Sequence, residues 1–165
     1  MRLPSLLLAA ALSLSPLASR AAAPVELRFT DFFAQPIGPR GLEPSAKLLS
    51  VNGQAVKLTG FMVRREQPQA GSFLLVPVPI TMAEHADGEA DDLPPSAVTV
   101  VLASGQRDRL VAFQPGPLTL SGRLEFGAAE DATGRVSWVR LHLDPAALAT
   151  QAGTAAPAHT HGHSH

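Results

Sequence analysis

The stretch LTLSGRLEF, residues 118–126, alternates apolar and polar positions along most of its length. Successive side chains of a β-strand point to opposite faces, so this alternation places one set of residues on a single side. An alternation of this kind is typical of a strand with one buried face, and a glycine in its middle predicts a bulge or a sharp bend. The residues on the predicted inner side are Leu118, Leu120, Gly122, Leu124 and Phe126.

Four further runs carry strand signals on either side of this stretch. A tight turn at Asn52-Gly53 precedes the first of them, and Gly60 lies in its middle as Gly122 does above. Five short strands with bend-forming glycines predict an all-β fold, namely a small five-stranded barrel of the oligonucleotide/oligosaccharide-binding (OB) type, with an open β-sandwich as the alternative. The four runs are AVKLTGFMVRRE (55–66), SFLLVPVPI (72–80), AVTVVLA (97–103) and RVSWVRLHL (135–143).

The segment before these strands is less regular. VELRFTDFF, residues 25–33, predicts a first strand or an edge segment. The Pro- and Gly-containing stretch at 34–54 predicts a loop with at most one short helical turn near Ser45 to Leu49.

Both ends of the chain are expected to lie outside the folded domain. Residues 1–21 carry Arg2, then an apolar run, then small residues, which is the plan of a secretory signal peptide rather than of a membrane span. After residue 148 the composition shifts to small residues that have no apolar face to bury. We therefore predict a signal peptide (1–21), one β-rich domain (22–148), a disordered tail (149–165) and a periplasmic location.

The composition excludes several classes of function. The formal net charge is −1 and the charged fraction is 16%, with no basic block, so neither nucleic acid nor an anionic membrane surface is a predicted partner. The chain has no cysteine, which excludes disulfides, thiol catalysis and cysteine-type zinc sites. Any metal must be held by His, Asp, Glu or backbone oxygen.

Three motifs resemble those of a known group of proteins: NGQAVKLTGFMV (52–63), FLLVPVP (73–79) and DLPPSAVTVVL (92–102). They are similar to a family of uncharacterised exported proteins of Gram-negative bacteria that carry a domain of unknown function. The resemblance implies a periplasmic β-rich domain encoded near transport systems for transition metals. A related branch carries cysteine and histidine in the loop between the second and third strands, where this chain has His85 but no cysteine.

The loop EHADGEADD, residues 84–92, is the first candidate metal site. It combines one imidazole with several carboxylates, which can bind a borderline or hard divalent cation. The predicted ligands are His85, Asp87 and Glu89. The alternative is a solvated acidic loop without a ligand.

The second candidate metal site is the end of the chain, AHTHGHSH, where histidines occupy every second position. Neutral imidazole suits Zn(II), Cu(II) and Ni(II), and the small residues between the histidines let the chain curl around one ion. With no surrounding shell to fix the rings, such a tail favours buffering or delivery over catalysis. The predicted ligands are His159, His161, His163 and His165; the alternative is a tail without a role in the cell.

Two weaker candidates involve arginine. If Val139 and its alternate neighbours face the core, then Trp138, Arg140 and His142 line the opposite face, which can form a small ligand or partner surface. The alternative is that Trp138 fills the barrel or covers a sheet edge while Arg140 and His142 are solvated. Arg40, in a Pro-Gly loop, either binds an anion or simply occupies a tight surface turn. No G-x-S-x-G elbow occurs, and we predict that the protein is not an enzyme.

The leading functional prediction is a periplasmic accessory protein that binds a transition metal, with zinc as the first candidate, and passes it to a periplasmic or membrane metal-transport protein. The alternative is a non-metal binding or interaction module with an incidental histidine tail.

Overall fold

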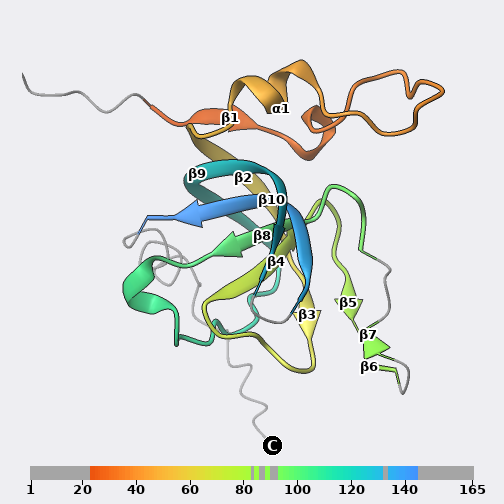
Figure 1. The fold of residues 1–165 in the computed structure, drawn as a ribbon. Coiled ribbons are helices and arrows are strands. Elements are labelled where there is room, and N and C mark those ends of the chain that lie inside the picture. The colour runs from red at the N-terminus through yellow and green to blue at the C-terminus, as the bar shows by residue number, and fades with distance from the viewer. Residues whose placement is uncertain (1–22, 83, 86–87, 90–92, 132–133, 145–165) are drawn as a thin grey trace, which may run out of the picture.

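The computed structural model describes residues 23–82, 84–85, 88–89, 93–131 and 134–144. These residues are nearly all β and include only short helical turns, as predicted (Figure 1). Along the chain the elements are β1 (Val25–Leu27), η1 (Phe29–Asp31), α1 (Ala46–Ser50), β2 (Ala55–Met62), β3 (Arg64–Arg65), β4 (Ser72–Val76), β5 (Thr81–Met82), β6 (Glu84–His85), β7 (Gly88–Glu89), β8 (Val98–Val101), η2 (Ser104–Gln106), β9 (Pro117–Glu130) and β10 (Val136–Leu143).

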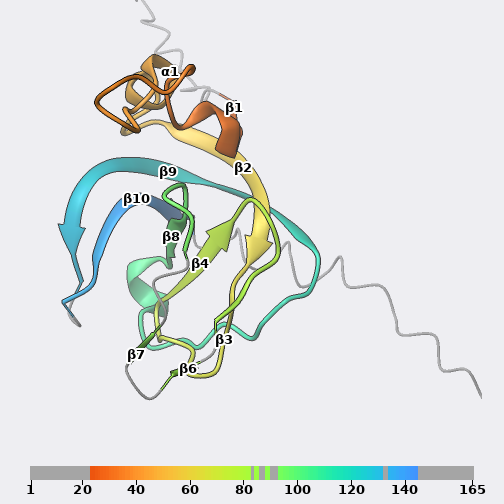
Figure 2. The same cartoon turned by 90° about the vertical axis from the view of Figure 1, so that its right-hand side faces the viewer.

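One mixed sheet of six strands curls into a barrel-like ring. Its order is β1-β2-β4-β8-β10-β9, and β9 also pairs with β2, so the five strands from β2 to β9 close on themselves. β8 and β10 run parallel, whereas the other neighbours in the ring are antiparallel. The five predicted strand segments supply these five strands, and the predicted OB-like fold is confirmed as a barrel-like ring rather than an open sandwich (Figure 2).

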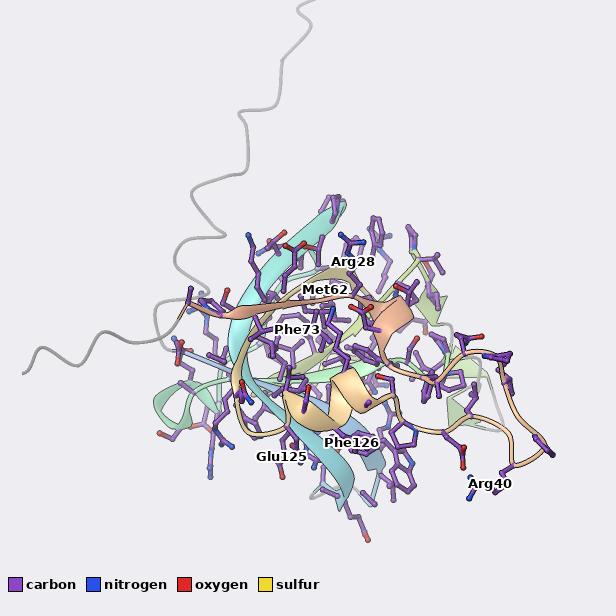
Figure 3. The ribbon with its side chains drawn as sticks, turned by 90° about the horizontal axis from the view of Figure 1, so that it is seen from above. Arg28, Arg40, Met62, Phe73, Glu125 and Phe126 are labelled. Atoms are coloured by element: carbon purple, nitrogen blue, oxygen red, sulfur yellow. The ribbon has the colours of Figure 1, made fainter. Side chains whose placement is uncertain are left out.

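The alternating apolar side chains of residues 118–124 fill the inside of this ring. Leu118, Leu120 and Leu124 of β9 are buried, and Leu141 and Leu143 of β10 are buried against them. Fully burying a leucine side chain stabilises a fold by about 1.5–3 kcal/mol. Figure 3 shows Met62 and Phe73, from β2 and β4, within the same interior.

The two mid-strand glycines lie where neighbouring groups approach most closely. A Cβ added at Gly60 would lie 2.6 Å from the Phe29 ring and 2.8 Å from the Val76 carbonyl oxygen. A Cβ added at Gly122 would lie 2.4 Å from the carbonyl oxygen of His142. The register of β2 with β9 is continuous at both glycines, so neither marks a bulge in that pairing. What each glycine permits is a close approach of neighbouring atoms that a side chain would prevent.

One end of the ring is covered by β1, η1 and α1 (Figures 1 and 2). β1 adds to the sheet as a short parallel neighbour of β2. Ser45 caps α1 by accepting a hydrogen bond from the Leu48 backbone N–H at 3.0 Å, which matches the predicted helical turn. Leu48 and Phe32 are fully buried under this cover. The Lys47 ammonium lies 2.6 Å from Asp31 and lowers the pKa of that carboxyl.

The described residues of the polar insertion between β4 and β8 take part in short pairings. β5 runs parallel to β3, and β6 pairs with β7 so that His85 lies opposite Gly88. Within the described ranges, no helix has the length and apolar character needed to cross a bilayer.

Candidate functional site

The strongest candidate site is a pocket of about 380 Å³ on one flank of the ring. Its floor comes from β4 and β8, and its walls come from the β2–β4 connection, the β9–β10 hairpin and the segment after η2. The pocket therefore draws on segments that are far apart in the sequence. Its lining residues are Arg65, Gln69, Ala70, Gly71, Ser72, Phe73, Leu74, Thr99, Val101, Arg107, Ala129, Glu130, Asp131, Arg135, Ser137 and Arg140.

Arginine dominates the charged lining of this pocket. Arg65, Arg107, Arg135 and Arg140 contribute guanidinium groups, whereas only Glu130 and Asp131 contribute carboxylates. The pocket therefore has a positive lining in a chain whose overall charge is −1.

Arg65, from the β2–β4 connection, and Arg135, from the β9–β10 hairpin, both line this pocket. Burial, and then the charge of Arg65, lower the pKa of Arg135 from its usual range. The neighbouring Arg64 points elsewhere, with its guanidinium 4.7 Å from the centre of the Phe113 ring. Alternation along β3 thus sends one arginine into the pocket and the other onto an aromatic face.

Arg140 is the most buried of the four, with 8% of its surface exposed. Its Nη1 donates hydrogen bonds to the carbonyl oxygens of Gly127 at 2.9 Å and Ser137 at 2.7 Å, and its Nη2 lies 3.1 Å from Glu125. The register of β9 and β10 shifts between Ser137 and Val139 at a β-bulge. Arg140 therefore ties both strands together beside the bulge and fixes the shape of this side of the pocket.

Glu125 is shared between Arg140 and His142. Its second carboxylate oxygen lies 2.6 Å from Nε2 of His142. The hydrogen bond from Arg140, and then the one from His142, lower the pKa of Glu125 to about 2. Glu125 is thus held as a carboxylate that neutralises the buried guanidinium.

This carboxylate gives the domain a defined acid sensitivity. The pKa of Glu125 is about 2 in the folded state, below its ordinary value of 4.5, so the ionised form stabilises the fold above pH 4.5. We expect this stabilisation to be lost as the pH falls from about 4.5 to about 2. Urea unfolding measured at intervals across this window should show a smaller pH dependence in Glu125→Gln than in the parent.

The matched control for that measurement is Glu26→Gln, because Glu26 is exposed on β1. The control should keep the parent's pH dependence. If the free energy of unfolding changes equally with pH in the parent and in Glu125→Gln, the Glu125 ion pair is not the source of the acid sensitivity.

Gly71 positions the Arg107 segment at the rim of the pocket. Its N–H donates to the carbonyl of Arg109 and its own carbonyl accepts from Leu102 N–H, both at 2.9 Å. A Cβ at Gly71 would lie 2.5 Å from the Arg107 carbonyl oxygen, and its φ of +76° favours glycine. Backbone hydrogen bonds therefore join the β2–β4 connection, at Gly71, to the segments that precede and follow η2.

The predicted stripe of Trp138, Arg140 and His142 is only partly correct. Val139 and the alternate residues after it are buried as predicted, and Arg140 and His142 meet at Glu125. Trp138, which is 60% exposed, instead lines a separate apolar hollow beside Phe126. The alternative in which Arg140 is merely solvated is wrong, because this side chain is buried beside the bulge and donates hydrogen bonds to the carbonyl oxygens of Gly127 and Ser137.

Arg40 proves to be a surface arginine in a tight turn. Its Nε lies 3.0 Å from Glu43, and its side chain is 83% exposed. Figure 3 shows it at the outer end of its loop, away from the ring. The anion-binding alternative predicted for this loop has no geometric support.

The predicted metal ligands lie almost entirely outside the described residues. Asp87 and the four tail histidines, His159, His161, His163 and His165, are outside them, and so is the segment predicted as a signal peptide (1–21). For His85 and Glu89 the structure describes the backbone of β6 and β7 alone. Among the side chains that the structure describes, no group of three or more His, Asp or Glu residues could hold a metal ion.

No family model, curated protein or solved structure matches this chain. The function of the site therefore has to be inferred from its own geometry.

Proposed function

We propose that this protein is a non-catalytic binding module that takes a small polar ligand in the arginine-lined pocket. The observation that carries the proposal is the position of the pocket. It lies on β4 and β8, between the β2–β4 connection and the β9–β10 hairpin. In barrels of the OB type, the second and third strands of the barrel and the equivalent loops form the surface that binds oligonucleotides and oligosaccharides.

The size and lining of the pocket support binding rather than catalysis. A volume of about 380 Å³ is at the lower end of the range for small-molecule sites. The lining contains Ser72 and Ser137 but neither histidine nor lysine, so it offers neither hydroxyl the usual base that activates a nucleophilic serine.

With this function we propose the periplasm as the compartment. The signal-like pattern of residues 1–21 supports this, as does the resemblance of the motifs at 52–63, 73–79 and 92–102 to those of exported proteins. We propose membership of that family on the same motifs. In this compartment the expected ligands are saccharides and small metabolites rather than nucleic acid.

Blocking the pocket tests the proposal. We expect members of a panel of neutral sugars, sugar acids, sugar phosphates and amino acids to shift the amide NMR signals of Gly71, Ser72 and Thr99. Thr99→Trp should abolish these shifts, because Thr99 is on the floor and an indole would fill the cavity. Thr30→Trp, on an exposed position outside the pocket, should leave them unchanged. The proposal fails if no member of the panel shifts these signals, or if Thr99→Trp binds like the parent.

A second function is favoured by a separate observation, the four alternating histidines of residues 159–165. We propose that this tail captures a transition metal, with zinc as the leading candidate and Cu(II) and Ni(II) as others, and passes it to a metal-transport protein. Neutral imidazoles at this spacing provide several ligands without a rigid site, which favours rapid exchange.

Removing the tail separates this function from the pocket. We expect the full chain to bind Zn(II) at pH 7.5 in an isothermal titration and a chain that ends at Thr150 to lose this binding. At pH 5.0 the full chain should bind far less zinc, because imidazoles with ordinary pKa values near 6.5 are then protonated. Undiminished binding at pH 5.0 would exclude the tail as the main site and favour the carboxylates at 84–92.

A further inference from the structure

We propose that the pocket binds a small zwitterion, a free amino acid or a short peptide, whose carboxylate is recognised by Arg107 and whose ammonium is recognised by Glu130. This inference rests on the proposed binding function and adds the chemical class of the ligand. Arg107 directly follows η2 and Glu130 ends β9, so the two side chains come from different walls of the pocket.

Most of the charged side chains that line the pocket are already engaged within the fold. Arg140 donates hydrogen bonds to backbone carbonyl oxygens and is paired with a carboxylate outside the lining. Both carboxylate oxygens of Asp131 accept hydrogen bonds, one from the Arg135 backbone N–H at 3.1 Å and the other from the Gln69 side chain at 3.4 Å. Arg65 and Arg135 also interact with other groups of the chain. These side chains therefore have roles in the fold that need no ligand.

Arg107 and Glu130 are the two charged lining residues that remain. Both are exposed, and within the described part of the chain neither side chain forms a hydrogen bond or an ion pair. They are too far apart to pair with each other, yet both border one cavity of about 380 Å³. A cation and an anion on different walls of a small cavity are complementary to a ligand that carries both charges itself.

The backbone holds each of these two residues in place. The segment of Arg107 is joined to the β2–β4 connection, because the Gly71 N–H donates to the Arg109 carbonyl oxygen at 2.9 Å. Glu130 is the last residue of β9, and its Oε1 lies 3.6 Å from the position that a Cβ on Gly134 would take in the hairpin connection. Anchored backbones reduce the entropy that is lost when the two side chains close on a ligand.

The lining between these charges suits the rest of an amino acid. Ser72 and Thr99, on the strands that form the floor, carry hydroxyl groups that can donate to a carboxylate or accept from an ammonium. Small apolar side chains line the same cavity, namely those of Ala70, Val101 and Ala129. They can contact a short aliphatic side chain, so we expect small neutral amino acids to bind best.

The ligand test separates the two charges. NMR titration of the full chain with glycine, alanine, valine, serine and the dipeptide alanylalanine, followed at the amides of Gly71, Ser72 and Thr99, identifies the tightest binder. That compound is then compared with its N-acetyl derivative, which lacks the ammonium, and with its amide, which lacks the carboxylate. Each blocked form should bind about fivefold to tenfold more weakly, since a charged contact is worth up to about fivefold at an exposed site and about tenfold where water is partly excluded. A preference for alanylalanine over alanine identifies the ligand as a peptide, and the reverse identifies a free amino acid.

Two variants assign each charge of the ligand to its partner. In Arg107→Gln the zwitterion should bind as weakly as its amide binds to the parent, and binding of the amide should be unchanged. In Glu130→Gln the zwitterion should bind as weakly as the N-acetyl form, whose own binding should be unchanged. Both side chains are exposed and make no contact that stabilises the described part of the chain, so both variants should fold like the parent.

Arg109→Gln and Asp108→Asn are the matched controls, because these residues are exposed neighbours of Arg107 that lie outside the lining. Both should bind the zwitterion like the parent.

The zwitterion site is overturned if the N-acetyl form and the amide bind as tightly as the zwitterion, or if either glutamine variant keeps the parent's affinity for it. It is also overturned if glucose or glucose 6-phosphate shifts the pocket amides and no amino acid or dipeptide does. In these cases a ligand still occupies the pocket, so the binding function stands. If no member of the wider panel perturbs those amides, the binding function itself has failed.

Discussion

Gly122→Ala is expected to lower the free energy of unfolding by about 3 kcal/mol, the upper end of the usual cost of overpacking, and to leave little folded protein in moderate urea. The added Cβ would lie 2.4 Å from the carbonyl oxygen and 3.0 Å from the carbonyl carbon of His142. Both atoms belong to the backbone of β10, so no side-chain rotation can relieve the overlap. Gly122 also pairs with Val56 across β2, so a shift of β9 away from β10 would disturb the other side of the ring.

Gly105→Ala is the matched control for this substitution. A Cβ at Gly105 meets nothing within 4 Å, and this residue lies in the short helical turn η2 rather than in the ring. Its effect should stay within about 0.5 kcal/mol. Urea unfolding followed by circular dichroism measures both variants. A midpoint for Gly122→Ala equal to that of the parent would mean that β9 and β10 are further apart here than described.

The ring was predictable because its strands carry local signals. Alternating leucines along residues 118–124, and bend-forming glycines at 60 and 122, each specify a strand, a buried face or a bend without reference to distant residues. The structure extends β9 to Glu130, beyond the predicted Phe126, because residues 127–130 continue the pairing with β10 across the bulge. Only tertiary pairing holds this extension in place, so sequence alone gave no signal for it.

The pocket could not be predicted in the same way. Arg65 and Arg135 are separated in the sequence by β4, β8 and β9, and their presence in one pocket depends on the strand order of the ring. The local signal in the sequence was the pair Arg64 and Arg65 at the end of the predicted strand 55–66. Alternation there indicates that the two side chains point to opposite faces, but not which groups they contact. The prediction that Trp138, Arg140 and His142 share one face was only partly correct for a related reason. A β-bulge changes which face of the sheet a residue occupies, and simple alternation does not predict this change.

Arg140→Ala is expected to cost about 2–3 kcal/mol of stability and to weaken any ligand of the pocket. The substitution removes the donor to the Gly127 and Ser137 carbonyl oxygens and leaves Glu125 without its guanidinium partner. Because 42% of the Glu125 side chain is exposed, water would partly replace the lost charge, and the cost should fall below that of a fully buried broken pair. The unpartnered carbonyls beside the bulge account for the rest.

A double-mutant cycle with Glu125→Ala separates these two contributions. If the carboxylate carries much of the effect, the double variant should be clearly less destabilised than the sum of the single variants, because each single change already breaks the ion pair. If the bonds to the backbone dominate, the two effects should add. Arg123→Ala, at an exposed position of β9, should change stability by no more than about 0.5 kcal/mol. If Arg140→Ala is as stable as this control, then the hydrogen bonds and ion pair of Arg140 do not stabilise the pairing of β9 with β10.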